Sequence, residues 1–231
     1  MADPGVGGAE GRAGRWRTAL RSVQSAAIAG VVFAVSATIG IVRLIAGPTI
    51  AATDAEIEAY WSAPGAGEGI SLTLQLIFIG TAGFLWFVGV IRTRLGENEP
   101  KLFSTVFFGG GILFAALLLV GSAAIAVPAV LTDQVGRVPS VDVVLTSRSL
   151  GVIVLTDIAT RVQALVVFST SGLGLRTGAL PRWLSLVGFV VGLGLLVTFG
   201  FREPLIAIAF PVWVALVSVV LFFWTRPAPT V

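Results

Sequence analysis

Six long apolar stretches constrain this 231-residue chain more than any other feature of its sequence. A helix needs about 20 apolar residues to cross a hydrocarbon core about 30 Å thick, and its backbone groups must be bonded internally there. The alternating pattern typical of membrane barrels is not found. The sequence therefore predicts an all-α, polytopic membrane protein, a bundle of six transmembrane helices. The expected spans are residues 22–46, 70–91, a segment within 102–131 that ends near Pro128, 149–175, 183–201 and 204–225.

The composition agrees with a membrane location and limits the chemistry. Hydrophobic residues make up 56% of the chain and charged residues 12%, whereas soluble domains are about 25% charged. Cysteine and histidine are both absent, which excludes disulfides, thiolate metal sites and cysteine nucleophiles, and removes the usual general base near neutral pH. No catalytic constellation or phosphate-binding loop is recognisable. We therefore expect a protein that is not an enzyme and holds no cofactor or metal.

The distribution of basic residues predicts the orientation. Positively charged residues near spans favour the cytoplasmic side, and six spans with both termini cytoplasmic place ten of the 15 basic residues there. The domains are then a mobile basic cytoplasmic tail (1–21), a six-helix domain (22–225) and a short cytoplasmic tail (226–231). A signal peptide is the alternative for the N-terminus, but the first apolar run is longer than a typical signal core. The inner side would hold Arg12, Arg15, Arg17, Arg21, Arg92, Arg94, Lys101, Arg176, Arg182 and Arg226.

One span carries two charges, Asp157 and Arg161. Together they oppose insertion by about 5 to 7 kcal/mol, nearly cancelling the gain from the apolar residues around them. We expect both to point into the bundle with Thr160 and Ala164, with Gln75 from the second span as a hydrogen-bonding candidate. Their i, i+4 spacing allows an ion pair. Two interpretations stay open: a structural or docking pair, and a pathway for a substrate, ion or proton.

The first outer loop predicts a short helix. Arg43 lies about 33 Å along the first helix from Arg21, at the outer interface, where its side chain can snorkel. Beyond it, Thr53 and Glu56 form a capping-box pattern that predicts a helix over 54–62. Its apolar residues Ile57, Tyr60 and Trp61 are expected at the lipid surface. Its acidic residues are expected in water, with weak calcium or magnesium binding as the less favoured reading. The acidic residues of this loop are Asp54, Glu56, Glu58 and Glu68.

The second outer loop and several small residues suggest contact surfaces. Residues 128–149 form a loop of about 20 residues rich in valine, which either tucks onto the bundle or meets another protein. Gly188 and Gly192 form a GxxxG pattern that allows close helix contact. Pro211 is expected to kink the last span. We find no inverted repeat of three plus three spans, which lowers the case for a secondary transporter.

Two segments carry a family resemblance. GFLWFVGVIRTRLGENEPKLFSTVFFGGGILFAALLLVGSA (83–123) and LPRWLSLVGFVVGLGLL (180–196) resemble uncharacterised actinobacterial six-helix membrane proteins. Among such proteins is the accessory membrane subunit of the mycobacterial Mce lipid-import assembly, and the length and character here are similar to it. The resemblance carries no site residues. It implies an accessory subunit of an envelope complex in lipid import.

The expectation from the sequence is therefore a non-enzymatic, multi-pass protein of the plasma (inner) membrane, acting as an accessory or scaffold subunit. Its partners would be other membrane-protein subunits and membrane lipids, and not nucleic acid. The alternative is a small-molecule or ion transporter that uses Asp157 and Arg161. A third, weaker interpretation is a lipid-modifying intramembrane enzyme. The residues that could contact a partner or substrate are Asp157, Arg161, Gln75 and Arg43.

Overall fold

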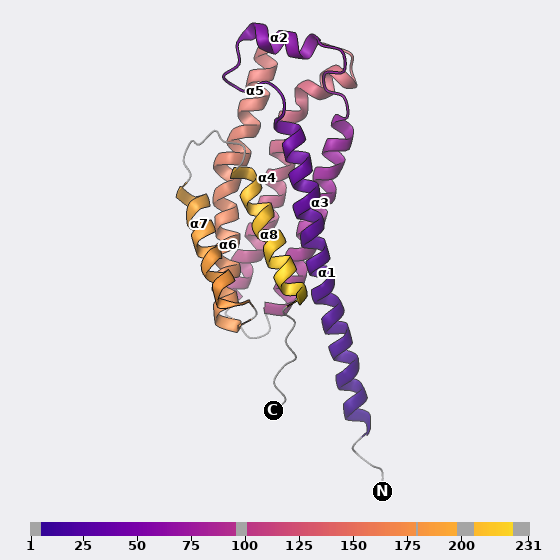
Figure 1. Ribbon diagram of the computed structural model, residues 1–231, viewed down its shortest axis with the longest axis vertical. Helices are drawn as coiled ribbons and strands as arrows, with labels where there is room; N and C mark the ends of the chain where they lie inside the picture. Colours follow the sequence, from indigo (N-terminus) through magenta and orange to yellow (C-terminus); the bar gives the residue numbers. More distant parts are fainter. Residues whose placement is uncertain (1–5, 96–100, 179, 198–205, 224–231) are drawn as a thin grey trace.

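The protein is an all-α bundle (Figure 1). The computed structural model describes residues 6–95, 101–178, 180–197 and 206–223. In these ranges α5, the π-helix η1 and α6 run on as one helix, so that seven helices result. The expected all-α class is confirmed, and the number of six spans stays a prediction. The elements are α1 (Val6–Ile45), α2 (Asp54–Ser62), α3 (Ile70–Leu95), α4 (Lys101–Asp133), α5 (Val141–Val152), η1 (Ile153–Ile158), α6 (Ala159–Thr177), α7 (Arg182–Val197) and α8 (Ile206–Phe223).

Four helices in the described part of the chain are long and apolar enough to cross a membrane. They occupy Gln24–Ile45, Ile70–Arg92, Ser104–Asp133 and Val141–Thr177, and thus correspond to the first four predicted spans. α7 and α8 are shorter apolar helices over Arg182–Val197 and Ile208–Phe223. Parts of the last two predicted spans, residues 198–205 and 224–225, lie outside the described residues. The chain thus has the helices of a multi-pass membrane protein.

The first helix begins much earlier than the first predicted span. α1 starts at Val6 and runs for 40 residues, or about 60 Å, through most of the segment expected to be a mobile tail. Alanine, arginine, leucine and glutamate are strong helix formers, and after Pro4 no proline interrupts residues 6–21. Their propensity outweighs the glycines on which the expectation of an irregular tail rested. Residues 1–5 and 226–231 lie outside the described residues.

The predicted second outer loop is largely helical. α4 does not end near Pro128 but continues through it to Asp133, and α5 already begins at Val141. The connection is therefore residues 134–140, and the expectation of a loop of about 20 residues was wrong. Proline removes one backbone donor, but the last turns remain bonded: Thr132 Oγ1 donates to the Pro128 carbonyl oxygen, and Gln134 N to that of Val130, at 3.0 Å each.

Four phenylalanines fill the centre between α1, α3, α4 and α8. Every pair among them has ring centroids 4.8 to 6.1 Å apart, and each side chain is at most 2% exposed. Aromatic pairs in such tilted and edge-on arrangements contribute about 0.5 to 1.5 kcal/mol beyond area burial. This cluster, which we call the Phe cluster, closes the space between the four helices at its level. It consists of Phe33, Phe84, Phe114 and Phe210.

Small residues bring the outlying helices close, as the GxxxG pattern predicts. α7 packs against α6, and a Cβ atom added at Gly192 would lie 2.8 Å from the ring of Phe168. A Cβ at Gly188 would collide with the hydroxyl of Ser171. On the other side of the bundle, α1 packs against α3 and α8, and a Cβ at Gly30 would collide with Ser218 of α8. These glycines are therefore required by helix contacts within the chain.

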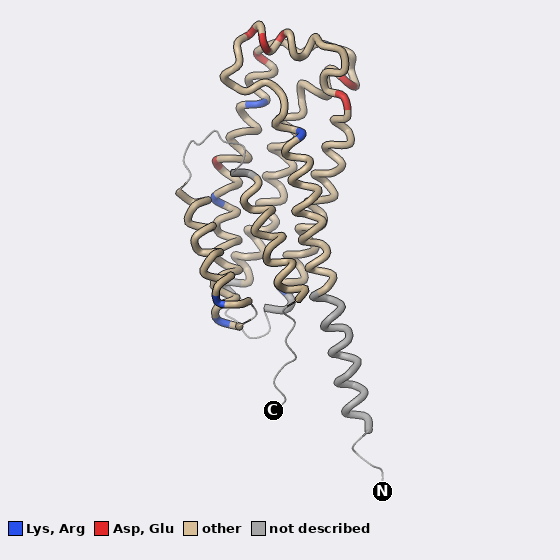
Figure 2. Tube along the Cα trace, viewed as in Figure 1, with Lys and Arg blue, Asp and Glu red and all other residues tan. Residues whose placement is uncertain are grey.

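The short helix α2 lies across one end of the bundle (Figure 1), which we call the cap end. Its bounds and its capping box of Thr53 with Glu56 confirm the prediction. The expected lipid contact of its apolar face was wrong, because Ile57 is 1% and Trp61 7% exposed. Both instead face down onto the bundle and join its core, while Tyr60 is 41% exposed. Acidic residues gather at this end (Figure 2).

Candidate functional site

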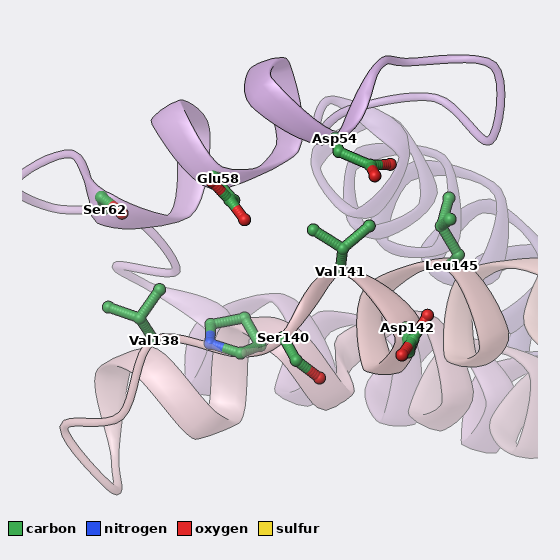
Figure 3. A pocket seen from close by; sticks show the side chains of 9 residues that line it. Asp54, Glu58, Ser62, Val138, Ser140, Val141, Asp142 and Leu145 are labelled. Carbon is green, nitrogen blue, oxygen red and sulfur yellow. The ribbon is translucent and has the colours of Figure 1, made fainter.

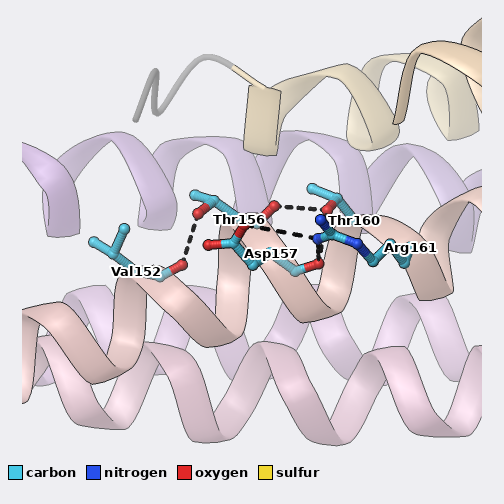
Figure 4. A network of polar contacts seen from close by, with 5 residues as sticks. All are labelled: Val152, Thr156, Asp157, Thr160 and Arg161. Carbon is cyan, nitrogen blue, oxygen red and sulfur yellow. Dashed lines mark hydrogen bonds and ion pairs between the residues drawn. The ribbon is translucent and has the colours of Figure 1, made fainter. Parts of the chain in front are cut away.

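Asp157 and Arg161 form an ion pair one helical turn apart (Figure 4). The distance between Arg161 Nη1 and Asp157 Oδ1 is 3.7 Å, and Nη1 also donates to the backbone carbonyl oxygen of Asp157. Two threonines flank the pair and bond back along the helix: Thr156 Oγ1 donates to the Val152 carbonyl oxygen at 2.8 Å, and Thr160 Oγ1 to that of Thr156 at 2.6 Å. Each of these contacts joins residues of the helix that carries the pair.

A π-helix underlies the aspartate. η1 spans Ile153–Ile158, and the N–H of Ala159 donates to the carbonyl oxygen of Val154, five residues back. Such wide turns are rare and are frequently found at functional sites. η1 packs against α4, where a Cβ at Gly121 would lie 2.6 Å from the Leu155 side chain. The tight contact at Leu155 and the position of Asp157 are therefore set by the same turn.

The ion pair does not point into the bundle, contrary to the expectation. The Asp157 side chain is 38% exposed and that of Arg161 31%, whereas Thr160 and Ala164, predicted on the same face, are fully buried. On this helix, the buried side therefore includes Thr160 and Ala164, and the exposed side begins at Asp157 and Arg161. Small residues such as Ala164 bring α6 close to α4 and α7, so that the longer charged side chains take the neighbouring, open side.

Gln75 is not the hydrogen-bonding partner from another helix. It lies on an exposed face of α3, whose main neighbours are α1 and α4. The buried amide near the pair is Gln163, two residues beyond Arg161 and 3% exposed, and its Oε1 has no hydrogen-bond partner among the described residues. The sequence contains this glutamine in the same polar run, but its depth could only be learned from the packing of α6.

Both charges fall within the thickness of a bilayer. Counted from Arg176 in the last turn of α6, Arg161 lies about 22 Å and Asp157 about 28 Å along the helix, against a hydrocarbon core about 30 Å thick. The pair would thus lie in the part of the membrane nearer the cap end. There an arginine can reach toward the interface while its carboxylate partner stays beside it.

Two further arginines, Arg43 and Arg148, lie at the cap end. Arg43 lies in the last turn of α1, is exposed, and donates from Nε to Thr73 Oγ1 at 3.1 Å. Arg148 of α5, which sequence reasoning did not single out, is only 9% exposed. The sequence feature that could have identified Arg148 is its place in a row of residues at helical spacing i, i+4, i+7 and i+11. All four residues of this row are buried. The row consists of Val144, Arg148, Gly151 and Leu155.

An acidic cleft lies between α2 and the start of α5 (Figure 3). Its volume is about 520 Å³, and its acidic lining consists of Asp54 and Glu58 of α2 and Asp142 of α5. Within the ranges the structure describes, no group of three acidic side chains is placed to hold a metal ion. The acids of α2 are exposed, as a solvated acidic surface requires.

Comparison with protein-family models, with curated proteins and with solved structures finds no match for this chain.

Proposed function

We propose that this chain is a non-enzymatic accessory or scaffold subunit of a larger complex in the plasma membrane, docking other membrane subunits through the face that carries Asp157 and Arg161. We call this face of η1 and α6 the charged face. The observation that carries the proposal is that about a third of each side chain of this intramembrane ion pair is exposed, on a face that the other described helices leave uncovered. Six spans with both termini cytoplasmic belong to the same proposal.

Exposure of the ion pair to lipid is unfavourable. A carboxylate or guanidinium at the centre of the bilayer costs about 2.5 to 3.5 kcal/mol on the insertion scale, and the cost is smaller for this pair, which lies nearer the cap end and can snorkel. A neighbouring membrane helix that offers hydroxyl, amide or charged groups would offset this cost, because interhelical polar contacts hold membrane helices together. Ile158 and Leu165, exposed beside Asp157 and Arg161, supply apolar area for such a contact.

The packing of the bundle favours a scaffold over a transporter. The Phe cluster fills the space between α1, α3, α4 and α8, so that these described helices enclose no passage at its level. The chain also lacks histidine and cysteine, which limits its catalytic chemistry. Lipid import as the process rests only on the similarity of length and overall character to the accessory membrane subunit of a lipid-import assembly; residues 83–123 and 180–196 themselves resemble uncharacterised six-helix membrane proteins.

The test is affinity purification of the tagged protein at native expression level in a mild detergent, with mass spectrometry and a native gel. We expect a stoichiometric set of membrane partners on a high-mass band. The double variant Asp157→Asn, Arg161→Gln should lose them, with at least a tenfold drop in recovered partner, because about 1.4 kcal/mol changes an equilibrium tenfold. Arg176→Gln, at the end of the same helix, is the matched control and should retain them.

A lone monomer or homo-oligomer from native membranes would contradict the scaffold role. The transporter is then the second candidate, and η1 favours it, because wide turns are frequently found at functional sites and this one carries Asp157. In that case Asp157→Asn should abolish uptake in a transport assay while leaving folding and abundance intact.

A further inference from the structure

The cap end contains a cavity of about 150 Å³ with polar walls from five segments of the chain. It lies where the last turn of α1, α2, the segment after α2, the first turn of α3 and α5 come together, and Leu44, Ile70 and Ile125 form apolar parts of its lining. At about 30 Å³ per water molecule, the volume is that of several waters. The polar lining consists of Arg43, Tyr60, Trp61, Glu68, Thr73 and Arg148.

Arg148 places a buried positive charge in this wall. Its Nη2 donates to the carbonyl oxygens of Ile45 at 2.9 Å and Gly47 at 3.2 Å, which fixes the guanidinium against the end of α1. Among the described residues no carboxylate lies within ion-pair distance of it, although Glu68 lines the same cavity. Carbonyl dipoles offset only part of the cost of a buried charge, so an anion in the cavity would be favourable.

Arg43 supplies a second guanidinium in a fixed orientation. Its Nε donates to Thr73 Oγ1 at 3.1 Å, and the same hydroxyl donates to the Gly69 carbonyl oxygen at 3.1 Å. Gly69 has φ +76°, and a Cβ there would lie 2.8 Å from Arg43 Nη2, so the chain passes close against the guanidinium. With one hydrogen bond from Nε, the remaining donors of this fork are available to a ligand.

Trp61 provides an independent sign of a ligand. The side chain is 7% exposed, lines the cavity, and its Nε1 has no hydrogen-bond partner within the part of the chain the structure describes. A buried donor left without a partner costs about 1 to 3 kcal/mol, and nearly all such groups in proteins are bonded. An acceptor oxygen inside the cavity would remove this cost.

The geometry points to a binding site for a phosphate group in this cavity. Two arginines and a tryptophan from three elements line it, and arginine forks match the oxygens of a phosphate. With Glu68 in the wall, the formal charge of the lining is +1, which suits a singly charged phosphate, either free phosphate or the phosphodiester of a lipid headgroup. The site does not depend on the scaffold role of the charged face.

The experiment uses the full-length protein in a neutral detergent. Binding of free phosphate is measured by equilibrium dialysis with radiolabelled phosphate, competed by chloride or acetate. Binding of a headgroup is measured by native mass spectrometry with short-chain phosphatidylglycerol, against uncharged diacylglycerol of the same chain length. We expect one molecule bound per chain in one or both arms. Phosphate alone identifies the free ion as the ligand, and the phospholipid alone identifies a headgroup.

Three variants assign the binding to the cavity. Trp61→Phe keeps the packing of the ring and removes the donor, and should weaken binding by about tenfold or more. Arg148→Gln should weaken it at least as much, with Arg43→Gln as a second variant if the former fails to fold. Arg137→Gln, an exposed arginine in the 134–140 connection, is the matched control and should bind as the wild type does. No binding in either arm, unchanged binding by Trp61→Phe, or equal competition by acetate would overturn the assignment.

Discussion

At the scale of single residues, Thr53 and Glu56 show how a local pattern is read directly from sequence. The Thr53 backbone N–H and hydroxyl donate to Glu56 Oε2 at 2.8 and 2.9 Å, and the Glu56 N–H donates to Thr53 Oγ1 at 3.4 Å. The bonds from the Thr53 backbone and then from its hydroxyl lower the pKa of Glu56 below its ordinary value. All partners lie within four consecutive residues, so nothing distant decides the outcome.

Acidification should therefore loosen the first turn of α2. Because the folded pKa of Glu56 lies below its ordinary value, the stabilisation is present above that ordinary value and is lost as pH falls through the folded pKa. Hydrogen exchange of the amides at 56 and 57, corrected for intrinsic rates, should become faster over this range. In Glu56→Gln the acid-dependent part should vanish, because the side chain no longer titrates.

Removal of the threonine should act at every pH. Thr53→Ala deletes the cap acceptor and one donor to Glu56, which costs about 1 kcal/mol and raises exchange in the first turn of α2 about fivefold. An exchange rate equal to the wild type at neutral pH would show that packing of Ile57 and Trp61, and not the cap, holds this turn.

The positions of the charged residues on the long α5–η1–α6 helix were harder to predict from the sequence than the N-cap of α2. The sequence singled out Asp157 and Arg161 correctly as an i, i+4 pair, because spacing alone sets that contact. It could not tell which side of α6 is open, since this depends on how close α4 and α7 approach. Arg148 was assigned to a loop because the extension of α5 to Val141 was not foreseen. Long-range packing decides both cases.

At the scale of elements, glycine spacing predicted a helix contact correctly, whereas the apolar stretches did not predict the helix ends. The GxxxG of α7 does face α6, because a small residue every four positions leaves one groove along a helix. In contrast, α1 begins 16 residues before the first predicted span (Val6 against residue 22) because helix propensity continues where hydropathy falls, and α4 continues through Pro128 to Asp133. Hydropathy predicts the part of a helix that lies in lipid, but it does not predict where the whole helix begins and ends.

Gly188→Val should separate α7 from α6. A side chain at Gly188 meets Ser171, which is fully buried, and overpacking of this kind costs about 1 to 3 kcal/mol. Thermal unfolding of the purified protein in detergent should show a lower midpoint. Gly194→Val on the same helix is the matched control, because a Cβ there meets nothing within 4 Å. Equal midpoints for the two variants would mean that α7 adjusts without loss.

At the scale of the whole molecule, the two ends of the bundle differ in chemistry. The cap end carries α2, the acidic cleft and the Arg43–Arg148 cavity, whereas Arg176 and Arg182 lie where α6 ends and α7 begins. A basic end and an acidic end are the pattern expected when the basic end faces the cytoplasm. On the proposed orientation, the cap end lies outside.

The orientation can be measured cleanly because the chain has no cysteine. Single cysteines at Ser62, exposed at the cap end, and at Thr177, exposed at the other end, should react differently with a membrane-impermeant maleimide in intact cells. We expect labelling of Ser62→Cys in intact cells, and of Thr177→Cys only after the membrane is opened. The reverse pattern would invert the topology and place the phosphate cavity on the cytoplasmic side.

The wide turn of η1 sets the rotation of α5 relative to α6 within the helix that runs from Val141 to Thr177. A π-turn holds one residue more than an α-turn, so relaxing it to regular helix would rotate α5 by about 100° relative to α6. Such a rotation would carry the Arg148 guanidinium away from the carbonyls of Ile45 and Gly47. The direction in which the charged face points relative to the cavity at the cap end is therefore set by a single helical turn.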